Sequence, residues 1–364
     1  MLSTLVTVAA CFIALTSTLS IRDYDRNPSL FGGYGYNPGY VNYTVVPGLF
    51  QQDDPATNAS TFNFTASNFG LIDRTYPTDS SCENGSQATQ WQRLAHYIRT
   101  LNNEAPRNVE YKLLYMGRHG EGWHNAAESY YGTPAWNCFW SEKDGNGTAV
   151  WADAHLTANG IKQALAVNAF WAKEMAEQKI PVPESYYTSP LSRCLATANL
   201  TFSGLALPRE HPFVPQVKEL FREGISGHTC DRRSSKTYIH DSFPWYTFEA
   251  GFTEDDELWE ALHGETSQDE DIRSKKVLDD VFTHDKSTYI SITSHSGEIA
   301  SLLRVLGHRV FSLSTGAAIP VLVRAEALTA ASPSPTIQPF TALSTCAVAP
   351  TIRASTCNDC SCCS

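Results

Sequence analysis

The sequence lacks features that would place it in several common classes of protein. It has no basic cluster, since 27 lysines and arginines stand against 38 aspartates and glutamates, for a formal net charge of −11. Nucleic-acid binding depends on a basic surface, so no nucleic-acid partner is expected. No internal repeat is present. The apolar stretch from Leu5 to Leu19 is short for a membrane span, so no membrane partner is expected either.

The first twenty residues favour a secretory signal peptide. They carry no charged side chain, and the small residues Thr18 and Ser20 are suited to a cleavage site, although the usual basic start is missing. We therefore expect a secreted, extracellular protein, with the vacuole or cell wall as alternative destinations. Six N-x-[ST] sequons agree with secretion, at Asn42, Asn58, Asn63, Asn84, Asn146 and Asn199.

Ten cysteines make disulfides the default expectation in a secreted chain. Four of them, Cys82, Cys138, Cys194 and Cys230, are dispersed through the body of the sequence and allow three pairings. Five others crowd the end, where the spacing of CNDCSCC matches no standard zinc site. No metal or other cofactor is expected.

Composition divides the chain into four parts. After the signal peptide (1–20), residues 21–108 form an extension rich in Gly, Pro, Asn and Tyr, predicted to pack on the domain that follows. Residues 109–328 form the main domain, with an insertion at about 225–252 that has no clear periodicity. Residues 329–364 are rich in Ala, Ser, Thr, Pro and Cys, and no folded structure is expected there.

Apolar runs in the main domain alternate with helical patterns, which predicts an α/β fold, a three-layer α/β/α sandwich with a mostly parallel central sheet. The sheet is expected to begin only at about residue 109. Two acidic runs fit helix-capping patterns and predict helices that start at Thr253 and at Ser267. The predicted strands are Val109–Met116, Tyr186–Thr188, Val217–Phe221, Ser287–Thr293 and Ile319–Arg324.

Polar residues of one chemical kind follow these strands, and parallel strands bring their carboxyl ends to one edge of the sheet. Arg118 and His119 follow the first strand, and His295 follows the fourth. Arg193 lies one turn into the helix after the second strand, and Glu223 comes after the third. Arginine binds phosphate oxygens, histidine can attack phosphorus, and a carboxylic acid can protonate a leaving alkoxide. The set predicts phosphoryl chemistry.

The motifs Arg118-His119-Gly120 and Ser294-His295 together resemble the histidine phosphatase superfamily, which has the phosphoglycerate mutase-like fold. The continuation Glu121-Gly122-Trp123-His124-Asn125 resembles the mutase-type branch, and the segment from Val46 to Asp73 resembles secreted fungal members. Leu156-Thr157-x-x-Gly160 and Ser189-Pro190-Leu191-x-Arg193 match in the expected order, so the resemblance covers about Val46 to Arg324.

The resemblance implies a role for each of these residues. His119 matches the phosphorylated nucleophile and Glu223 the proton donor, with Glu121 as a weaker alternative for the acid. Arg118, Asn125, Arg193 and His295 match the phosphate-binding residues, and His295 also counts among the catalytic residues. His228, in the insertion, is a candidate substrate contact.

These residues lead us to expect a secreted phosphatase that hydrolyses phosphomonoesters of small molecules through a phosphohistidine at His119. One alternative is a phosphoglycerate mutase-like phosphotransferase, which returns the phosphoryl group to its product. The other is a catalytically silent secreted effector that keeps the pocket. The loop from Trp123 to Asp153 and the segment from Ile225 to Phe252 are rich in aromatic residues, so we expect them to determine the leaving group.

Overall fold

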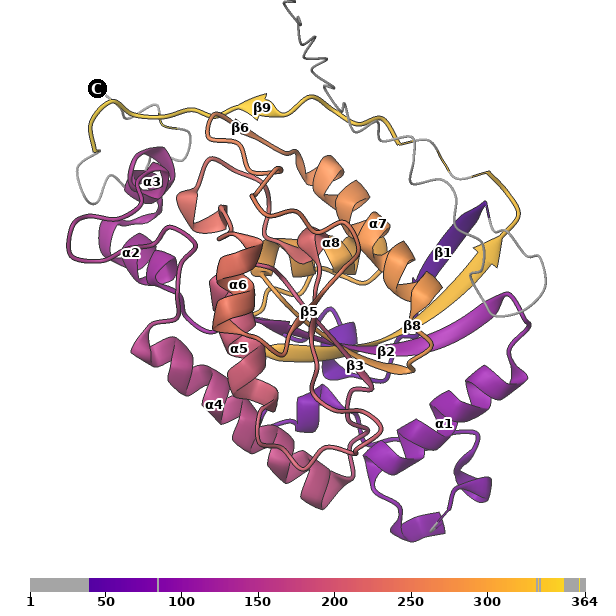
Figure 1. The fold of residues 1–364 in the computed structure, drawn as a ribbon. Coiled ribbons are helices and arrows are strands. Elements are labelled where there is room, and N and C mark those ends of the chain that lie inside the picture. Colours follow the sequence, from indigo (N-terminus) through magenta and orange to yellow (C-terminus); the bar gives the residue numbers. More distant parts are fainter. Residues whose placement is uncertain (1–38, 84, 332, 334, 350–359, 361–364) are drawn as a thin grey trace, which may run out of the picture.

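A seven-stranded sheet runs through the centre of the protein, in the order β1-β8-β2-β7-β3-β4-β5 (Figure 1). From β2 to β5 each strand is parallel to its neighbour, while β8 is antiparallel to both β1 and β2. The sheet is therefore mostly parallel. The strands are β1 (Tyr40–Val45), β2 (Val109–Arg118), β3 (Ser185–Thr188), β4 (Gln216–Val217), β5 (Thr247–Phe248), β7 (Tyr289–Ser294) and β8 (Ala318–Leu328).

This computed structural model describes residues 39–83, 85–331, 333, 335–349 and 360. The predicted signal peptide lies outside the described residues. Within the described part of the chain, no helix combines the length and the apolar character needed to cross a membrane.

Helices cover both faces of the sheet, which gives the predicted three layers (Figure 1). Successive side chains of a strand point to opposite faces. On β2, Leu114 and Met116 accordingly pack with α7 (Ser267–His284) and α8 (Ser296–Val305). Leu113 and Tyr115 pack on the other face with α1 (Gln90–Glu104) and α4 (Ala158–Lys173). β2 is therefore buried on both faces and holds the residues at its end in a fixed place.

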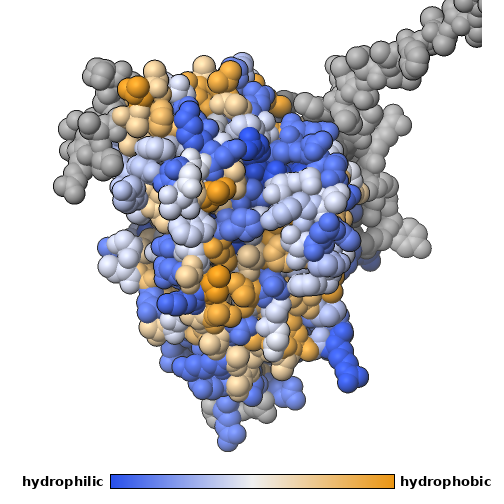
Figure 2. Space-filling view, turned by 60° about the vertical axis from the view of Figure 1, so that its left-hand side comes forward, coloured by the Kyte–Doolittle hydropathy of each residue, from blue (hydrophilic) through white to orange (hydrophobic). Residues whose placement is uncertain are grey.

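Four further helices complete the part of the fold that surrounds the carboxyl edge of the sheet. They are α2 (Trp123–Tyr131), α3 (Thr133–Cys138), α5 (Ser192–Phe202) and α6 (Lys236–Ser242). Figure 2 shows the side of the molecule that Figure 1 has on its left, where hydrophilic and hydrophobic residues are interspersed. On α2 the aromatic side chains of Trp123 and Tyr130 are exposed.

The sheet begins earlier than the sequence predicted. β1 pairs with β8 from Tyr40↔Leu328 to Val45↔Val323, so the expected start near residue 109 is wrong. The segment alternates as a half-buried strand does, since Val41 and Tyr43 are buried and pack with the α7 side of the core. The glycines and prolines around it concealed that alternation.

Two predicted helix starts are also wrong or displaced. No helix starts at Thr253, because the carboxylate of Asp256 accepts hydrogen bonds from Arg222 and from the backbone of Leu258 and Trp259 in a loop. The second helix, α7, is capped by Thr266 rather than Ser267, with Asp269 completing the capping box.

The tail was expected to have no folded structure, and this is wrong for the residues described there. Thr341–Ala342 forms β9, which pairs with β6 (His263–Gly264), and a disulfide joins Cys360 to Cys138 at the end of α3. Figure 1 shows the tail crossing the molecule from β8 toward α3. Backbone pairing and a covalent bond anchor this segment, and neither depends on the apolar periodicity that it lacks.

The disulfide also corrects the expected cysteine pairing. Cys138 pairs with the tail instead of with another dispersed cysteine. Cys82, Cys194 and Cys230 are free thiols, and the last two are buried.

Candidate active site

The ends of β2 and β7 bring Arg118-His119 and Ser294-His295 side by side. The two strands are parallel neighbours in a register that pairs Arg118 with Ser294, and the backbone N–H of His119 donates to the carbonyl of Ser294 over 3.0 Å. The centroids of the two imidazole rings lie 5.1 Å apart. The strand ends thus bring together His119 and His295, two predicted site residues that are 176 positions apart in the sequence.

His119 is placed as a nucleophile must be. Its side chain is buried, and Nδ1 lies 2.7 Å from the carbonyl oxygen of Gly120. A carbonyl only accepts, so Nδ1 carries the proton and Nε2 keeps its lone pair. Burial, then the charges of Arg193 and Arg118, hold the pKa of His119 well below its usual value, so the ring is neutral at neutral pH.

Gly120 is required for the turn after β2. A Cβ atom at this position would lie 2.4 Å from the carbonyl oxygen of Gly160 in α4. The backbone of the turn therefore packs directly against the helix, which fixes the carbonyl that orients His119.

Two arginines lie beside His119, Arg118 half-buried and Arg193 buried, and both keep unpartnered N–H groups. Nη1 of Arg118 donates to the carbonyl of Leu313 over 2.7 Å. Arg193 donates from Nη1 to the carbonyl of Cys230 (2.6 Å) and from Nη2 to Oδ1 of Asp231 (2.7 Å). Among the described residues, Nε of neither arginine has a hydrogen-bond partner. Such N–H groups suit the oxygens of a phosphate group.

The electrostatics of the two arginines differ. Burial lowers the pKa of Arg118 from its usual value. Burial alone would also lower the pKa of Arg193, but Asp231, followed by the Cys230 and Cys194 groups, raises it above the usual value. A guanidinium stays charged in either case, so both arginines are cations at neutral pH.

His295 is held from the far side by two side chains. Its Nε2 lies 2.7 Å from Oγ of Ser189, which follows β3, and 3.3 Å from Sγ of Cys194 in α5. The ring is fully buried, and burial followed by the charge of Arg193 lowers its pKa well below the usual value. His295 is therefore a neutral hydrogen-bonding group beside His119.

Glu223 lies at the start of α8, immediately beyond His295. Its carboxylate accepts hydrogen bonds from the backbone N–H of Glu298 (3.1 Å), Gly297 (3.3 Å) and Gly224 (3.1 Å). Free N–H groups at a helix N-terminus stabilise a carboxylate. The structure places Glu223 against the first turn of α8, which follows His295, and its role as the proton donor stays a prediction.

The strand before Glu223 is shorter than predicted. β4 ends at Val217, and a 3₁₀ turn at Glu219–Phe221 replaces the rest of the predicted strand. Glu223 therefore reaches the site from a loop.

Asn125 and His228 stay predictions as substrate contacts. Oδ1 of Asn125 accepts from the backbone N–H of Gly122 over 3.0 Å, so that half of its amide caps α2. The ring of His228 lies 6.1 Å from that of Trp136, and its carbonyl accepts from Nε1 of Trp259. His228 thus faces the aromatic residues that surround the site.

The weaker candidate for the acid, Glu121, is occupied elsewhere. Its carboxylate accepts from the hydroxyl of Thr157 over 2.6 Å and from Nδ2 of Asn159 over 3.1 Å. Both partners belong to the start of α4, so this side chain joins the turn after β2 to that helix.

Sequence reasoning missed two residues. His124, in the first turn of α2, is buried with its ring centroid 5.3 Å from that of His119. Asp231 is the counter-ion of Arg193. The only sequence signal for His124 was its place beside Asn125, and for Asp231 its place beside His228. Neither has a periodic pattern that would show where it points.

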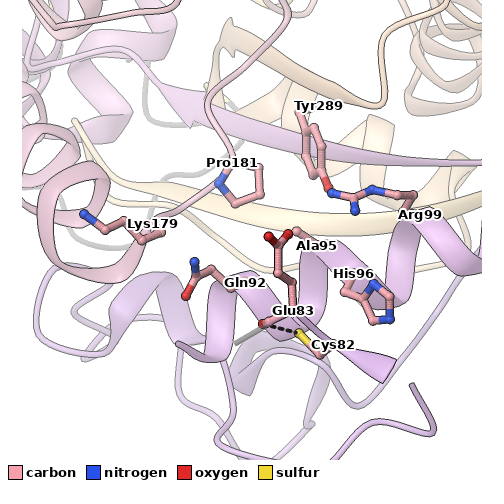
Figure 3. Close-up of a pocket in the computed structure, with 9 residues that line it drawn as sticks. All are labelled: Cys82, Glu83, Gln92, Ala95, His96, Arg99, Lys179, Pro181 and Tyr289. Atoms are coloured by element: carbon pink, nitrogen blue, oxygen red, sulfur yellow. Dashed lines mark hydrogen bonds between the residues drawn. The ribbon is translucent and has the colours of Figure 1, made fainter. Parts of the chain in front are cut away.

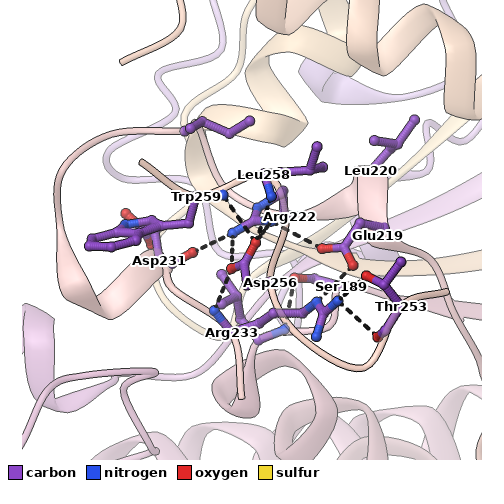
Figure 4. Close-up of polar contacts among 12 residues, drawn as sticks. Ser189, Glu219, Leu220, Arg222, Asp231, Arg233, Thr253, Asp256, Leu258 and Trp259 are labelled. Atoms are coloured by element: carbon purple, nitrogen blue, oxygen red, sulfur yellow. Dashed lines mark hydrogen bonds and ion pairs between the residues drawn. The ribbon is translucent and has the colours of Figure 1, made fainter. Parts of the chain in front are cut away.

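Charged side chains joined by hydrogen bonds fix the segment from Glu219 to Trp259 (Figure 4). Arg222 is fully buried and forms two 2.7 Å hydrogen bonds with Asp256, and it also donates to the carbonyl of Asp231. Arg233 donates to Glu219 over 2.7 Å. This network holds the loop that carries the counter-ion of Arg193.

Within the described residues, His228, Cys230 and Asp231 bring potential metal-ligating atoms within 4.8 Å of one another. The carboxylate of Asp231 and the carbonyl of Cys230 are both bound to Arg193. The arrangement is therefore accounted for by the arginine, and we assign no metal to it.

A cavity of about 320 Å³ lies elsewhere, between α1 and the start of β7 (Figure 3). Its lining includes His96 and Arg99 of α1 and Tyr289, the first residue of β7. His295 follows the last residue of that strand, so the cavity is at the opposite edge of the sheet. We place the chemistry at the carboxyl edge, where the unpartnered donors and the neutral histidines are.

Comparison with known proteins identifies the class to which this fold and site belong. Residues 114–313 match the histidine phosphatase superfamily (branch 1). A protein of Arthroderma benhamiae named probable phosphoglycerate mutase is 52% identical over 295 residues, which are 81% of this chain and 88% of the relative. A probable phosphoglycerate mutase of Saccharomyces cerevisiae is 33% identical, over 66% of this chain and 86% of that protein.

The chain thus belongs to the histidine phosphatase superfamily, a family that acts on phosphorylated small molecules. Among solved structures, a phosphoglycerate mutase from Thermus thermophilus is 18% identical with a TM-score of 0.32, over 64% of this chain and 99% of that one. A mycobacterial glucosyl-3-phosphoglycerate phosphatase is also 18% identical, with a TM-score of 0.36, over 58% of this chain and 91% of that one.

Proposed function

We propose that the protein is a secreted phosphatase that hydrolyses phosphomonoesters through a phosphohistidine at His119. The observation that carries the proposal is the hydrogen bond from Nδ1 of His119 to the carbonyl of Gly120, because it leaves Nε2 unprotonated near the charges of Arg193 and Arg118. Two guanidinium cations match the two charges of a phosphomonoester dianion and stabilise the transition state as the phosphoryl group is transferred.

The reaction proceeds in two steps. Nε2 of His119 attacks the phosphorus in line, the bond to the leaving oxygen breaks, and Glu223 gives that oxygen a proton. Water then attacks the phosphohistidine, Glu223 takes a proton from the water, and inorganic phosphate leaves. The N–H groups at the start of α8 stabilise the carboxylate form of Glu223 that exists between the two steps.

Secretion is part of the proposal. The apolar start of the sequence and the disulfide between Cys138 and Cys360 both support it, because disulfides persist in oxidising compartments. Phosphoglycerates are intracellular, so secretion also favours hydrolysis over a mutase reaction.

The test is turnover of a generic aryl phosphate by His119→Ala. We expect no detectable hydrolysis, whereas the matched control His240→Ala, whose side chain is exposed on α6, keeps normal turnover. Trapping an acid-labile, base-stable phosphoprotein in the parent, absent from the variant, would exclude a silent effector. Normal hydrolysis by His119→Ala would refute the assignment.

A mutase is the second candidate, and the names of two relatives favour it. Incubation of the protein with a phosphoglycerate discriminates between the two activities. A phosphatase releases inorganic phosphate, and a mutase yields the isomeric phosphoglycerate without net phosphate release.

A further inference from the structure

His124 is a buried polar side chain for which the proposed reaction has no role. It is 9% exposed, and Nδ1 is shielded from solvent. Neither ring nitrogen has a hydrogen-bond partner among the described residues. Leaving a buried polar group without a partner costs about 1–3 kcal/mol. A side chain that costs stability in this place suggests a binding role.

The backbone directs the ring of His124 toward the phosphate-binding residues. A Cβ atom on Gly122 would lie 2.6 Å from Nδ1 of His124 and 3.5 Å from Cδ of Arg193. The ring of His124 and the side chain of Arg193 therefore both pack against the backbone at Gly122, and the ring lies in space that glycine leaves open. Because Asn125 accepts from the N–H of Gly122, the first turn of α2 is fixed in this conformation.

The ring is neutral and therefore has one N–H donor. Burial, then the charge of Arg193, lowers the pKa of His124 well below its usual value. Arg118 and Arg193 already supply two positive charges, which balance a phosphate dianion. A neutral imidazole adds a hydrogen bond to that anion without adding a third charge.

We propose that His124 is a third phosphate-binding side chain beside Arg118 and Arg193, and that its N–H donates to a non-bridging oxygen of the phosphate while His119 attacks. The inference rests on the proposed function and extends it by one binding residue. The centroids of the His124 and His119 rings are 5.3 Å apart. With its hydrogen bond to the phosphate, His124 then keeps the phosphorus in line with Nε2 of His119.

The test measures binding of inorganic phosphate by titration calorimetry in a His119→Ala background, where no turnover interferes. His124→Phe keeps the ring volume and loses the donor, so we expect its affinity for phosphate to fall about tenfold or more, as for loss of a hydrogen bond to a charged group. His124→Gln or His124→Asn should restore affinity, because one of the two amides replaces the donating nitrogen. Tyr130→Phe, exposed on the same helix, is the matched control and should bind as the parent does.

The outcomes separate the two proposals. If the His119→Ala parent binds no phosphate, the proposed function fails and this inference fails with it. If the parent binds phosphate and His124→Phe binds equally well, only this inference is overturned. Should His124→Phe not fold, the imidazole ¹⁵N resonances of the His119→Ala protein give the answer, with the His124 signal assigned by its loss in His124→Gln. A shift of that signal on addition of phosphate supports the proposal, and an unchanged signal overturns it.

Discussion

Arg118 and Arg193 have the same proposed role, which is to bind phosphate, yet different parts of the molecule hold them. Arg118 ends β2, and both its backbone N–H and its Nη1 donate to carbonyls in the segment just before β8. Arg193 is in α5, and its guanidinium is bound by Cys230 and Asp231 from the insertion. One arginine is positioned by the sheet, and the other by a 3₁₀ turn of the insertion, Thr229–Asp231.

The comparison shows that two different forces hold the site together. The sheet edge is fixed by backbone pairing and by apolar burial on both faces of β2. The insertion is fixed by ion pairs that are largely shielded from solvent. Arg222 and Asp256 pair at its two ends, and Asp231 within it pairs with Arg193. Breaking one partner of a buried ion pair leaves an uncompensated charge, so the insertion side should be the more fragile.

The largest effect is expected at Glu223, where the two parts meet. Its carboxylate is bound by α8 on the sheet side, and the chain continues into the insertion. Glu223→Gln keeps the shape and removes the proton donor, so turnover of an aryl phosphate should fall by about 10²–10⁴. The matched control is Glu121→Gln, which should keep turnover within a few fold, because Glu121 serves only to bond Thr157 and Asn159.

Steady-state kinetics of both variants check this. A loss confined to Glu121→Gln would mean that the turn after β2, and not the loop before the insertion, supplies the acid. Inorganic phosphate binding should persist in Glu223→Gln, which shows that the loss is chemical rather than structural.

The sheet side of the site could be predicted from the sequence. An apolar strand that stops at a polar residue indicates the carboxyl edge of a parallel sheet, and this pattern alone brought Arg118, His119 and His295 together. The register of β2 and β7 confirms their proximity. The fold class was predictable for the same reason, since five of the seven strands carry apolar periodicity.

The insertion side could not be predicted. Asp231 reaches Arg193 across 38 residues, and such a contact depends on tertiary distance rather than on any spacing in the sequence. The acidic run at Thr253 shows the ambiguity clearly. Asp256 fits a helix cap in the sequence, but in the structure it is the buried partner of Arg222. A sequence pattern cannot distinguish a helix cap from a buried ion pair, because both place a carboxylate against N–H groups.

The next largest effect is expected at Asp231. Asp231→Asn leaves Arg193 buried without its counter-ion, so the free energy of unfolding should fall by about 3 kcal/mol, as for a broken buried ion pair. Binding of inorganic phosphate should also weaken, because the guanidinium loses a fixed partner. Urea unfolding and calorimetry measure the two effects. An unchanged stability would mean that the sheet side alone supports Arg193.

The third prediction concerns pH and Glu270, on α7 near Glu223. Burial, then the negative charge of Glu223, raises the pKa of Glu270 from 4.5 to about 7. The folded state thus binds a proton that the unfolded state releases, so this group stabilises the fold below pH 4.5, and the stabilisation is lost as the pH rises through 7. The parent should therefore lose stability relative to Glu270→Gln between pH 5 and 8, by on the order of 2 kcal/mol.

Urea unfolding of parent and variant at several pH values measures this difference. If the free energies of unfolding of parent and variant change in parallel from pH 5 to 8, the predicted effect of Glu270 is contradicted. The measurement also links the two sides of the site, since Glu270 is on α7 and responds to the charge of Glu223, where the two sides meet.

The smallest effect is expected at Arg232, which pairs with Asp144 over 2.8 Å on the surface of the insertion. Asp144 is exposed and Arg232 is partly exposed, and Arg232 also lies over the ring of Trp259 at 5.0 Å. An exposed ion pair contributes about 0–1 kcal/mol and is weakened by salt. Arg232→Ala should therefore lower the free energy of unfolding by less than about 1 kcal/mol. Unfolding at low and high salt measures it, and a loss as large as that of Asp231→Asn would show that surface charges, rather than the buried network, hold the insertion in place.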